Sequence, residues 1–253
     1  MRRLVRGVVA GMLVLGAGSH AAQAQPPAGG YACPAAPVQR LDLPRTRAAI
    51  LRQQPVVIVA FGSSSTFGAQ ASDPGDSYPA ELQDRLNAAL PGAEISVLNR
   101  GINGQDAKRE DARMTADVLA VRPQAVIWQV GANAALRGEK PAVFTPLLQS
   151  GLARLRAAGI DVVLMDNQRS VRMLASPTNH RINAALSVLA RRNRASLFSR
   201  DRLMRLWAPD GTPPAAYLAA DGIHMNDRGY ACLAQALGRS ITAALREDTS
   251  KAR

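Results

Sequence analysis

The sequence predicts an α/β fold in which helices cover both faces of a parallel sheet. Short apolar runs alternate with longer segments of helical periodicity, and this alternation is typical of a chain that crosses over between parallel strands. Beyond residue 40, the 253-residue chain has no internal repeat and no second change in composition. It is long enough for one domain with a sizeable core, which we expect over residues 41–253.

Five apolar runs are the expected strands. They span residues 55–61, 94–99, 124–130, 160–165 and, more weakly, 195–199. If they take the flavodoxin-like order 2-1-3-4-5, the winding reverses between the first and third strands, where open sheets of this kind bind ligands beyond the carboxyl ends. Two polar segments follow those strands, GSSST at 62–66 and GANAALRG at 131–138. We therefore expect the two segments to meet at one site.

Apolar periodicity and helix-terminating residues define the expected helices. Residues 77–90 place Leu82, Leu86 and Leu90 on one face and end at a Pro-Gly pair. The remaining helices are expected over residues 105–121, over residues 141–158, after Pro177 and from near Asn226.

The amino-terminal residues have the pattern of an export signal. A basic start precedes the uncharged apolar run 7–18, and AQA at 22–24 fits a small-residue cleavage site. We predict a signal peptide over residues 1–24, with an uncleaved anchor as the alternative, and a Pro-, Ala- and Gly-rich tether over 25–40. The protein is then periplasmic or extracellular. No later run reaches the roughly 20 apolar residues of a spanning helix, so we expect no stable membrane insertion.

The two cysteines, Cys33 and Cys232, are expected to form a disulfide. An exported chain with an even number of cysteines is the usual setting for such a bond. Two free thiols are the alternative.

The chain is basic, with 31 Lys and Arg residues against 19 Asp and Glu and a formal net charge of +12. Such an excess can attract polyanions. However, the basic residues are scattered, and the densest cluster, RRNR at 191–194, lies at the end of an expected helix, where it suits the helix dipole. Because no motif combines basic with interleaved aromatic residues, we expect no nucleic-acid partner.

Several known motifs do not account for the serine cluster. A phosphate-binding loop would need a second glycine where Phe67 stands, and a lysine nearby. The nucleophile elbow G-x-S-x-G would need a glycine at Thr66. Beyond the signal segment only His180 and His224 are present, and no carboxylate or cysteine set completes a metal site. We expect neither a metal nor an organic cofactor.

A serine can instead act with a histidine and a carboxylate. Asp221 and His224 stand three residues apart, just before the last expected helix. A serine hydroxyl becomes a useful nucleophile when an imidazole takes its proton, and a carboxylate orients that imidazole and stabilises its cation. The order Ser, Asp, His along the chain is one of several that build this geometry.

Four segments together resemble the signature blocks of the SGNH hydrolases, also called the GDSL esterase and lipase family. GSSST resembles the first block and implies that Ser64 is the nucleophile. NRGINGQD resembles the second block and implies that the Gly104 amide binds the oxyanion. GANA resembles the third and implies that Asn133 is the side-chain oxyanion donor, and DGIH resembles the fourth, which contains Asp221 and His224.

The resemblance implies a three-layer α/β/α sandwich and an esterase that acts on small-molecule or polysaccharide esters, with short acyl or acetyl groups favoured because aromatic residues are few. Two residues depart from the family pattern, since Ser63 and Ala134 replace its usual aspartates. Neither aspartate is the nucleophile, base or oxyanion donor in the family, so we expect altered loop support rather than inactivity.

Alternatives remain open for each residue and for the function. Ser63 and Ser65 are the other candidate nucleophiles. The alternative roles are a turn residue for Asn133, the start of a helix for Gly104, and a turn or helix cap for Asp221. His180 is expected on a helix surface and Trp128 in the core, and Trp207 fits either the core or the site. An O-acyltransferase, or a binding module with an inactive site, would use the same fold.

Overall fold

The computed structural model describes residues 31–207 and 214–246; the predicted signal peptide lies outside them. The described residues contain a five-stranded, all-parallel sheet of order β2-β1-β3-β4-β5. The strands are β1 (Val56–Gly62), β2 (Ile95–Gly101), β3 (Ala125–Gln129), β4 (Asp161–Met165) and β5 (Ser196–Phe198). The predicted fold class and strand order are confirmed, with strand ends shifted by one or two residues.

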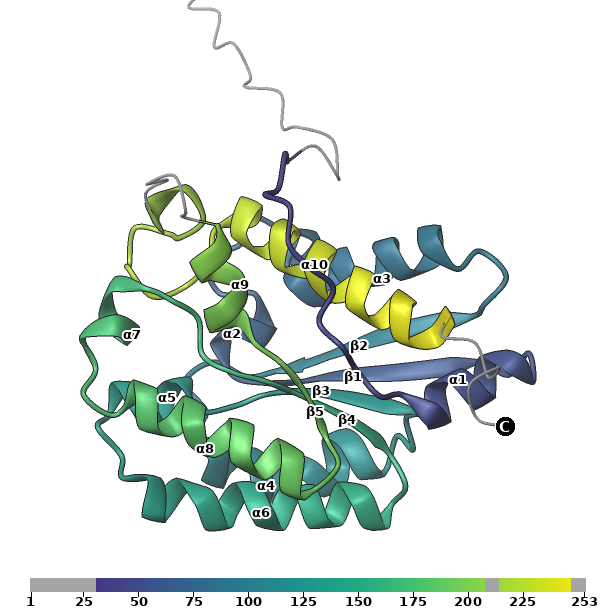
Figure 1. Ribbon diagram of the computed structural model, residues 1–253, viewed down its shortest axis with the longest axis horizontal. Helices are drawn as coiled ribbons and strands as arrows, with labels where there is room; N and C mark the ends of the chain where they lie inside the picture. The colour runs from purple at the N-terminus through teal and green to yellow at the C-terminus, as the bar shows by residue number, and fades with distance from the viewer. Residues whose placement is uncertain (1–30, 208–213, 247–253) are drawn as a thin grey trace, which may run out of the picture. The chain divides into compact units, whose positions relative to one another are not determined.

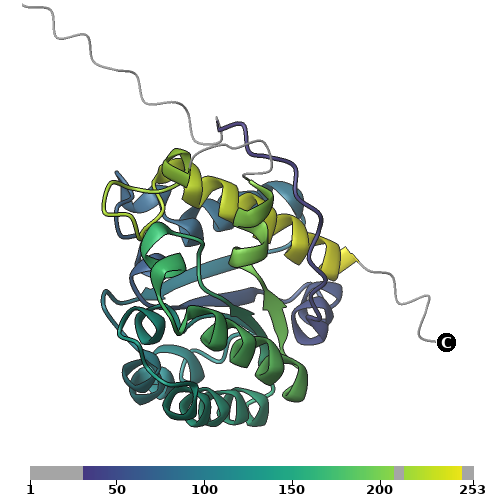
Figure 2. The ribbon, with the colours of Figure 1, turned by 60° about the vertical axis from the view of Figure 1, so that its left-hand side comes forward.

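Helices form a layer on each face of the sheet (Figures 1 and 2). One layer contains α1 (Pro44–Leu51), α3 (Tyr78–Ala89), α9 (Arg200–Leu206) and α10 (Asp227–Arg246). The opposite layer contains α4 (Ala107–Met114), α6 (Pro141–Ala157) and α8 (Asn179–Arg192). The arrangement is the predicted α/β/α sandwich.

Successive strand residues enter the two cores alternately, which accounts for the continuous apolar sequences of the strands. In β1, Ile58 and Ala60 pack beneath α3 and α10, whereas Val59 and Phe61 face the opposite layer. Trp128 of β3 is fully buried in that second core, as predicted. A parallel sheet covered in this way exposes chemistry mainly at its ends.

Short helices gather at the carboxyl ends of the strands. They are α2 (Ser64–Phe67), α5 (Ala132–Leu136) and α7 (Val171–Ala175), and Figure 1 shows them at the end of the sheet opposite α1. They are too short to display a helical period, so the sequence did not predict them. The helix expected over 105–121 is α4 followed by a π-helical segment, Thr115–Leu119; 3₁₀ turns occur at Pro74–Asp76 and Pro214–Ala216.

The described part of the predicted tether runs along the domain. The predicted disulfide between Cys33 and Cys232 is present, with 5.3 Å between the Cα atoms. Further on, the Gln39 side chain donates to the Ser199 carbonyl and accepts from the Ser199 N–H, and the backbone N–H of Gln39 donates to Ser240 Oγ. No helix in the described ranges combines the length and apolar character of a membrane span.

Candidate active site

Ser64 is the second residue after β1 and the first residue of α2. The strand ends at Gly62, where a Cβ would lie 2.5 Å from Thr66 Oγ1 and 2.6 Å from the Gln129 carbonyl oxygen. Only glycine fits this turn. Ser63 and Ser65 are buried, whereas Ser64 is half-buried. Of the three serines, Ser64 is therefore the one whose hydroxyl a substrate can reach.

The loop before α10 brings His224 and Asp221 to this serine. His224 Nε2 lies 2.8 Å from Ser64 Oγ, and His224 Nδ1 lies 2.5 Å from Asp221 Oδ2. Gly222, at φ +67°, makes the turn between the two residues, and the loop is held by the Gln168 side chain, which donates to the Ile223 carbonyl. The structure thus brings the predicted hydroxyl, imidazole and carboxylate into one hydrogen-bonded chain.

Asp221 is held in its ionised form. Its Oδ1 accepts from the backbone N–H groups of Ile223 and His224, each at 2.9 Å. Partial burial raises the pKa of this carboxyl, but the bond to the His224 ring and the two backbone bonds outweigh burial and hold the pKa below its usual value. An anion facing Nδ1 favours the tautomer with the proton on that nitrogen, so Nε2 can accept the Ser64 proton.

The two predicted oxyanion residues lie on neighbouring segments, a helix and a loop. Asn133, in α5, donates from Nδ2 to the Gln105 carbonyl at 2.7 Å, and the second N–H of this amide is left for another acceptor. Gly104 adopts φ +73°, a conformation that favours glycine, and a Cβ there would meet no atom within 4 Å. The loop after β2 therefore passes next to Asn133 and leaves open space at Gly104.

A buried glutamine that the sequence analysis missed supports the serine loop. Gln129 ends β3 and is fully buried, and its Oε1 accepts from Ser63 N and Oγ, both at 3.1 Å, and from Thr66 Oγ1 at 3.2 Å. Ser63, which replaces the family aspartate, thus contributes polar support to the loop. Ala134, the other departure, is buried within α5. A polar residue closing an otherwise apolar strand was the sequence signal for Gln129.

Two arginines also fix the edges of the site. Arg113 donates to the carbonyls of Gly62, at 2.8 Å, and Arg100, at 2.9 Å, and thereby ties β1 to β2. Arg137 donates to Asp106 Oδ2 at 2.5 Å and to the Gly104 carbonyl at 3.0 Å. Nothing in the sequence distinguishes these residues from the other arginines.

The remaining candidates lie elsewhere. His180 is exposed on α8, as predicted. Trp207 is buried in the core, and its ring centroid lies 4.6 Å from that of Tyr217. Within residues 31–207 and 214–246, no group of three or more His, Cys, Asp or Glu side chains is arranged to hold a metal ion.

Comparison with known proteins identifies the family. The model of the non-GDSL lipase-like family matches residues 32–247. The chain belongs to this family. The esterase TesA of Pseudomonas aeruginosa is 31% identical over 115 residues, which are 46% of this chain and 55% of TesA. An arylesterase of Vibrio mimicus is 32% identical over 89 residues, which are 35% of this chain and 44% of that protein. The chain thus spans about half the length of the curated relatives it matches.

Solved structures of esterases share the fold. A G-D-S-L family lipolytic protein from Desulfitobacterium hafniense superposes with a TM-score of 0.63 at 22% identity, over 73% of this chain and 99% of its own. Axe2, an acetylxylan esterase from Geobacillus stearothermophilus, superposes with a TM-score of 0.63 at 21% identity. The match covers 74% of this chain and 94% of Axe2. A two-domain esterase active on acetylated mannans superposes with a TM-score of 0.71 at 20% identity. The match covers 83% of this chain and 55% of that esterase. These structures confirm the fold, and together with the match to the lipase-like family model they confirm the resemblance to the SGNH hydrolases.

Proposed function

We propose that this protein is an exported serine esterase that hydrolyses carboxylic esters with short acyl groups. The observation that carries the proposal is the 2.8 Å contact between Ser64 Oγ and His224 Nε2, with Asp221 on the other side of the ring. Membership of a lipase-like family and the matches to an esterase and an arylesterase support the reaction class.

The chemistry follows from the positions of these three side chains. Ser64 Oγ attacks the ester carbonyl carbon while its proton passes to His224 Nε2, and Asp221 stabilises the resulting imidazolium. His224 then returns the proton to the departing alcohol, which leaves an acyl group on Ser64. Water, deprotonated by the same nitrogen, attacks this acyl-enzyme and releases the acid.

Negative charge on the carbonyl oxygen needs donors on the opposite side of Ser64. The Ser64 amide is in the first turn of α2, where N–H groups have no partner within the helix. The Gly104 amide and the second N–H of Asn133 complete the proposed oxyanion hole. Donors of this kind are worth about 3 kcal/mol each in transition-state stabilisation.

Exposed apolar side chains flank the site and support an ester with an apolar part. Phe67 and Ile102 stand on the β2 side, where the Ile102 amide donates to the Gly62 carbonyl. Val171 and Leu174 of α7 stand on the other side, where the Arg172 amide contacts the Gly222 carbonyl. Esterases of the same fold that act on acetylated xylan and mannan are consistent with acetyl groups on a polysaccharide as one substrate form.

Export to the periplasm or the extracellular medium is part of the proposal. It rests on the signal pattern of residues 1–24 and is supported by the Cys33–Cys232 disulfide, since such bonds persist in oxidising compartments.

Replacement of the nucleophile tests the function directly. Ser64→Ala should lower hydrolysis of p-nitrophenyl acetate by about 10⁵- to 10⁶-fold and abolish labelling by a fluorophosphonate probe. Ser65→Ala is the matched control because Ser65 is adjacent but buried, and it should retain both. Near-normal activity of Ser64→Ala would refute the assignment. No labelling of the wild type would indicate a binding module, and transfer to a sugar acceptor in excess of hydrolysis would indicate an acyltransferase.

A further inference from the structure

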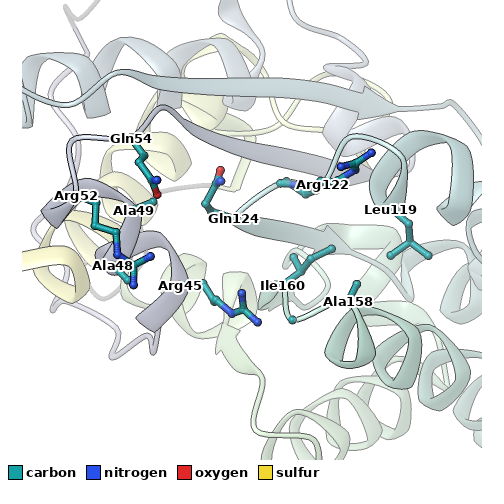
Figure 3. Close-up of a pocket in the computed structure, with 12 residues that line it drawn as sticks. Arg45, Ala48, Ala49, Arg52, Gln54, Leu119, Arg122, Gln124, Ala158 and Ile160 are labelled. Atoms are coloured by element: carbon teal, nitrogen blue, oxygen red, sulfur yellow. The ribbon is translucent and has the colours of Figure 1, made fainter.

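A cavity lies at the amino ends of the strands, away from Ser64. It has a volume of about 540 Å³, and the turn after α1, the loop before β3 and the turn between α6 and β4 form its walls. Three of its lining residues are arginines, Arg45, Arg52 and Arg122, and none is acidic. Figure 3 shows the three arginines on different sides of the cavity, with Gln124 between them.

These guanidinium groups differ from the arginines at the catalytic edge. Arg113 and Arg137 donate to carbonyl or carboxylate oxygens. Within the described ranges, the side chains of Arg45, Arg52 and Arg122 form neither a salt bridge nor a hydrogen bond with the protein. Three guanidinium groups thus surround one cavity, and their N–H donors are available to solvent or to a ligand.

The nearest polar groups add donors rather than negative charge. Gln124 Oε1 accepts from the Val57 amide at 2.7 Å, so the free part of this side chain is its NH₂ group. Asp161, beyond the cavity wall, is 7% exposed, and its carboxylate accepts from Arg45 N, Thr46 N and Thr46 Oγ1. Its charge is directed to the first turn of α1 instead of to the arginine side chains.

The backbone also holds two lining residues in a restricted conformation. Arg122 has φ +52°, a left-handed conformation that residues other than glycine rarely adopt. Gly159 has φ +67°, and a Cβ there would lie 2.1 Å from Arg45 Nη2. The Arg45 guanidinium therefore packs over Gly159, and any side chain at that position would displace it.

A smaller cavity of about 390 Å³ continues this surface. It shares Arg45, Gly159 and Ile160 with the first cavity and adds Arg156 and Arg194, together with Asp42 and Asp161. Over the two cavities together, five arginines line the edge of the sheet against two aspartates, so the edge stays positively charged along its length and suits a ligand with more than one anionic group.

We propose that this arginine-lined edge is a binding site for an oligoanion that carries two or more carboxylate, sulfate or phosphate groups. Guanidinium groups recognise such oxyanions through paired N–H···O bonds. No aromatic side chain lines either cavity, so the edge offers no platform on which the bases of a single-stranded nucleic acid could stack. The site is independent of the proposed ester hydrolysis.

Titration calorimetry tests the site with two probes, tripolyphosphate as a free oligoanion and tetragalacturonate as a chain of carboxylates. The triple variant Arg45→Gln, Arg52→Gln, Arg122→Gln should bind at least about 100-fold more weakly, at roughly tenfold per lost charged contact. The control triple variant Arg181→Gln, Arg202→Gln, Arg239→Gln removes the same charge from exposed sites on α8, α9 and α10. It should change the affinity by less than about threefold.

The outcomes are distinct. Weaker binding only in the first triple variant supports the site, and the probe that binds more tightly shows whether the ligand is a free oligoanion or an anionic chain. An equal loss of affinity in both variants would show that the probes are attracted only by the net positive charge of the protein. If neither probe binds, the arginines are merely solvated and the proposal is wrong. Tighter binding of oligo(dT) than of both probes would also overturn the proposal. Melting temperature and ester hydrolysis, which should be unchanged in both variants, confirm that each is folded.

Discussion

The two halves of the candidate active site differ in what their polar groups already bind. On the triad side, Ser64, His224 and Asp221 bond to one another in a continuous chain. On the oxyanion side, the Asn133 amide donates to the Gln105 carbonyl, and Arg137 binds the carbonyl of Gly104. The proposed triad is therefore already joined by hydrogen bonds in the structure, whereas the proposed oxyanion side is held by other contacts and keeps N–H groups free for a ligand.

The supports of the two halves differ as well. The triad loop is held mainly by bonds within itself, since both N–H groups after Gly222 donate to the Asp221 side chain, and Gln168 adds one bond from outside the loop. The oxyanion side depends on α4, whose first-turn cap Asp106 also binds Arg137. Substitutions on the triad side should thus affect chemistry alone, and substitutions on the oxyanion side should affect chemistry together with the order of the frame.

The largest effect should come from Asp221→Asn. An asparagine Oδ1 can still accept from Ile223 and His224, so only the atom that faces His224 Nδ1 changes, from an acceptor to a donor. The imidazole is then held in the wrong tautomer, and kcat for p-nitrophenyl acetate should fall by about 10⁴-fold with little change in melting temperature.

Asp227→Asn is the matched control for this substitution. Asp227 is six residues further along and accepts from Ser72, outside the triad. It should retain most of the activity. If the two variants lose activity to the same extent, Asp221 does not orient His224, and the triad side is not the preassembled half.

A smaller loss should follow Asn133→Ala. Removal of one oxyanion donor typically costs about 10²- to 10³-fold in kcat, with KM much less affected. Binding of a phosphonate transition-state analogue should weaken in parallel. Asn99→Ala is the control, because Asn99 also donates an amide N–H to a backbone carbonyl, that of Phe67. An equal change in the two variants would show that Asn133 only braces the loop.

The sequence predicted the triad side better than the frame that supports it. Ser64, Asp221 and His224 were singled out because the proposed chemistry needs particular residue types at local spacings, and the strands were predicted because burial on both faces makes them continuously apolar. Gln129, Arg113 and Arg137 were missed because their roles arise from contacts between segments distant in sequence. Of these, only Gln129 left a signal, as a polar residue at the end of an apolar strand.

Helix length explains the errors in the fold. Longer helices such as α3 and α6 were predicted from their apolar faces, whereas α2, α5 and α7 have four or five residues and display no complete face. The π-helical segment after α4 preserved enough periodicity to appear as one long helix in the sequence. These short elements are the ones that carry Ser64 and Asn133.

The smallest effect concerns the buried acid of α4. Glu110 is 1% exposed and accepts from Trp128 Nε1 at 2.8 Å, and burial raises the pKa of its carboxyl from 4.5 to about 8, against the lowering effects of Trp128 and Arg113. The folded protein therefore binds a proton that the unfolded chain releases near pH 4.5. The free energy of unfolding should fall as the pH rises from about 4.5 to about 8.

Glu110→Gln should remove this pH dependence, because glutamine stays neutral and can still accept from Trp128. Urea unfolding at pH 5 and pH 8.5 should show the wild type losing on the order of 4 kcal/mol more than the variant between the two pH values, at about 1.4 kcal/mol per pH unit. Arg137→Gln, which leaves Glu110 in place, should keep the wild-type slope. Equal slopes for the wild type and Glu110→Gln would mean that Glu110 does not titrate in the folded state. The frame under Asn133 would then be no more sensitive to pH than the triad side.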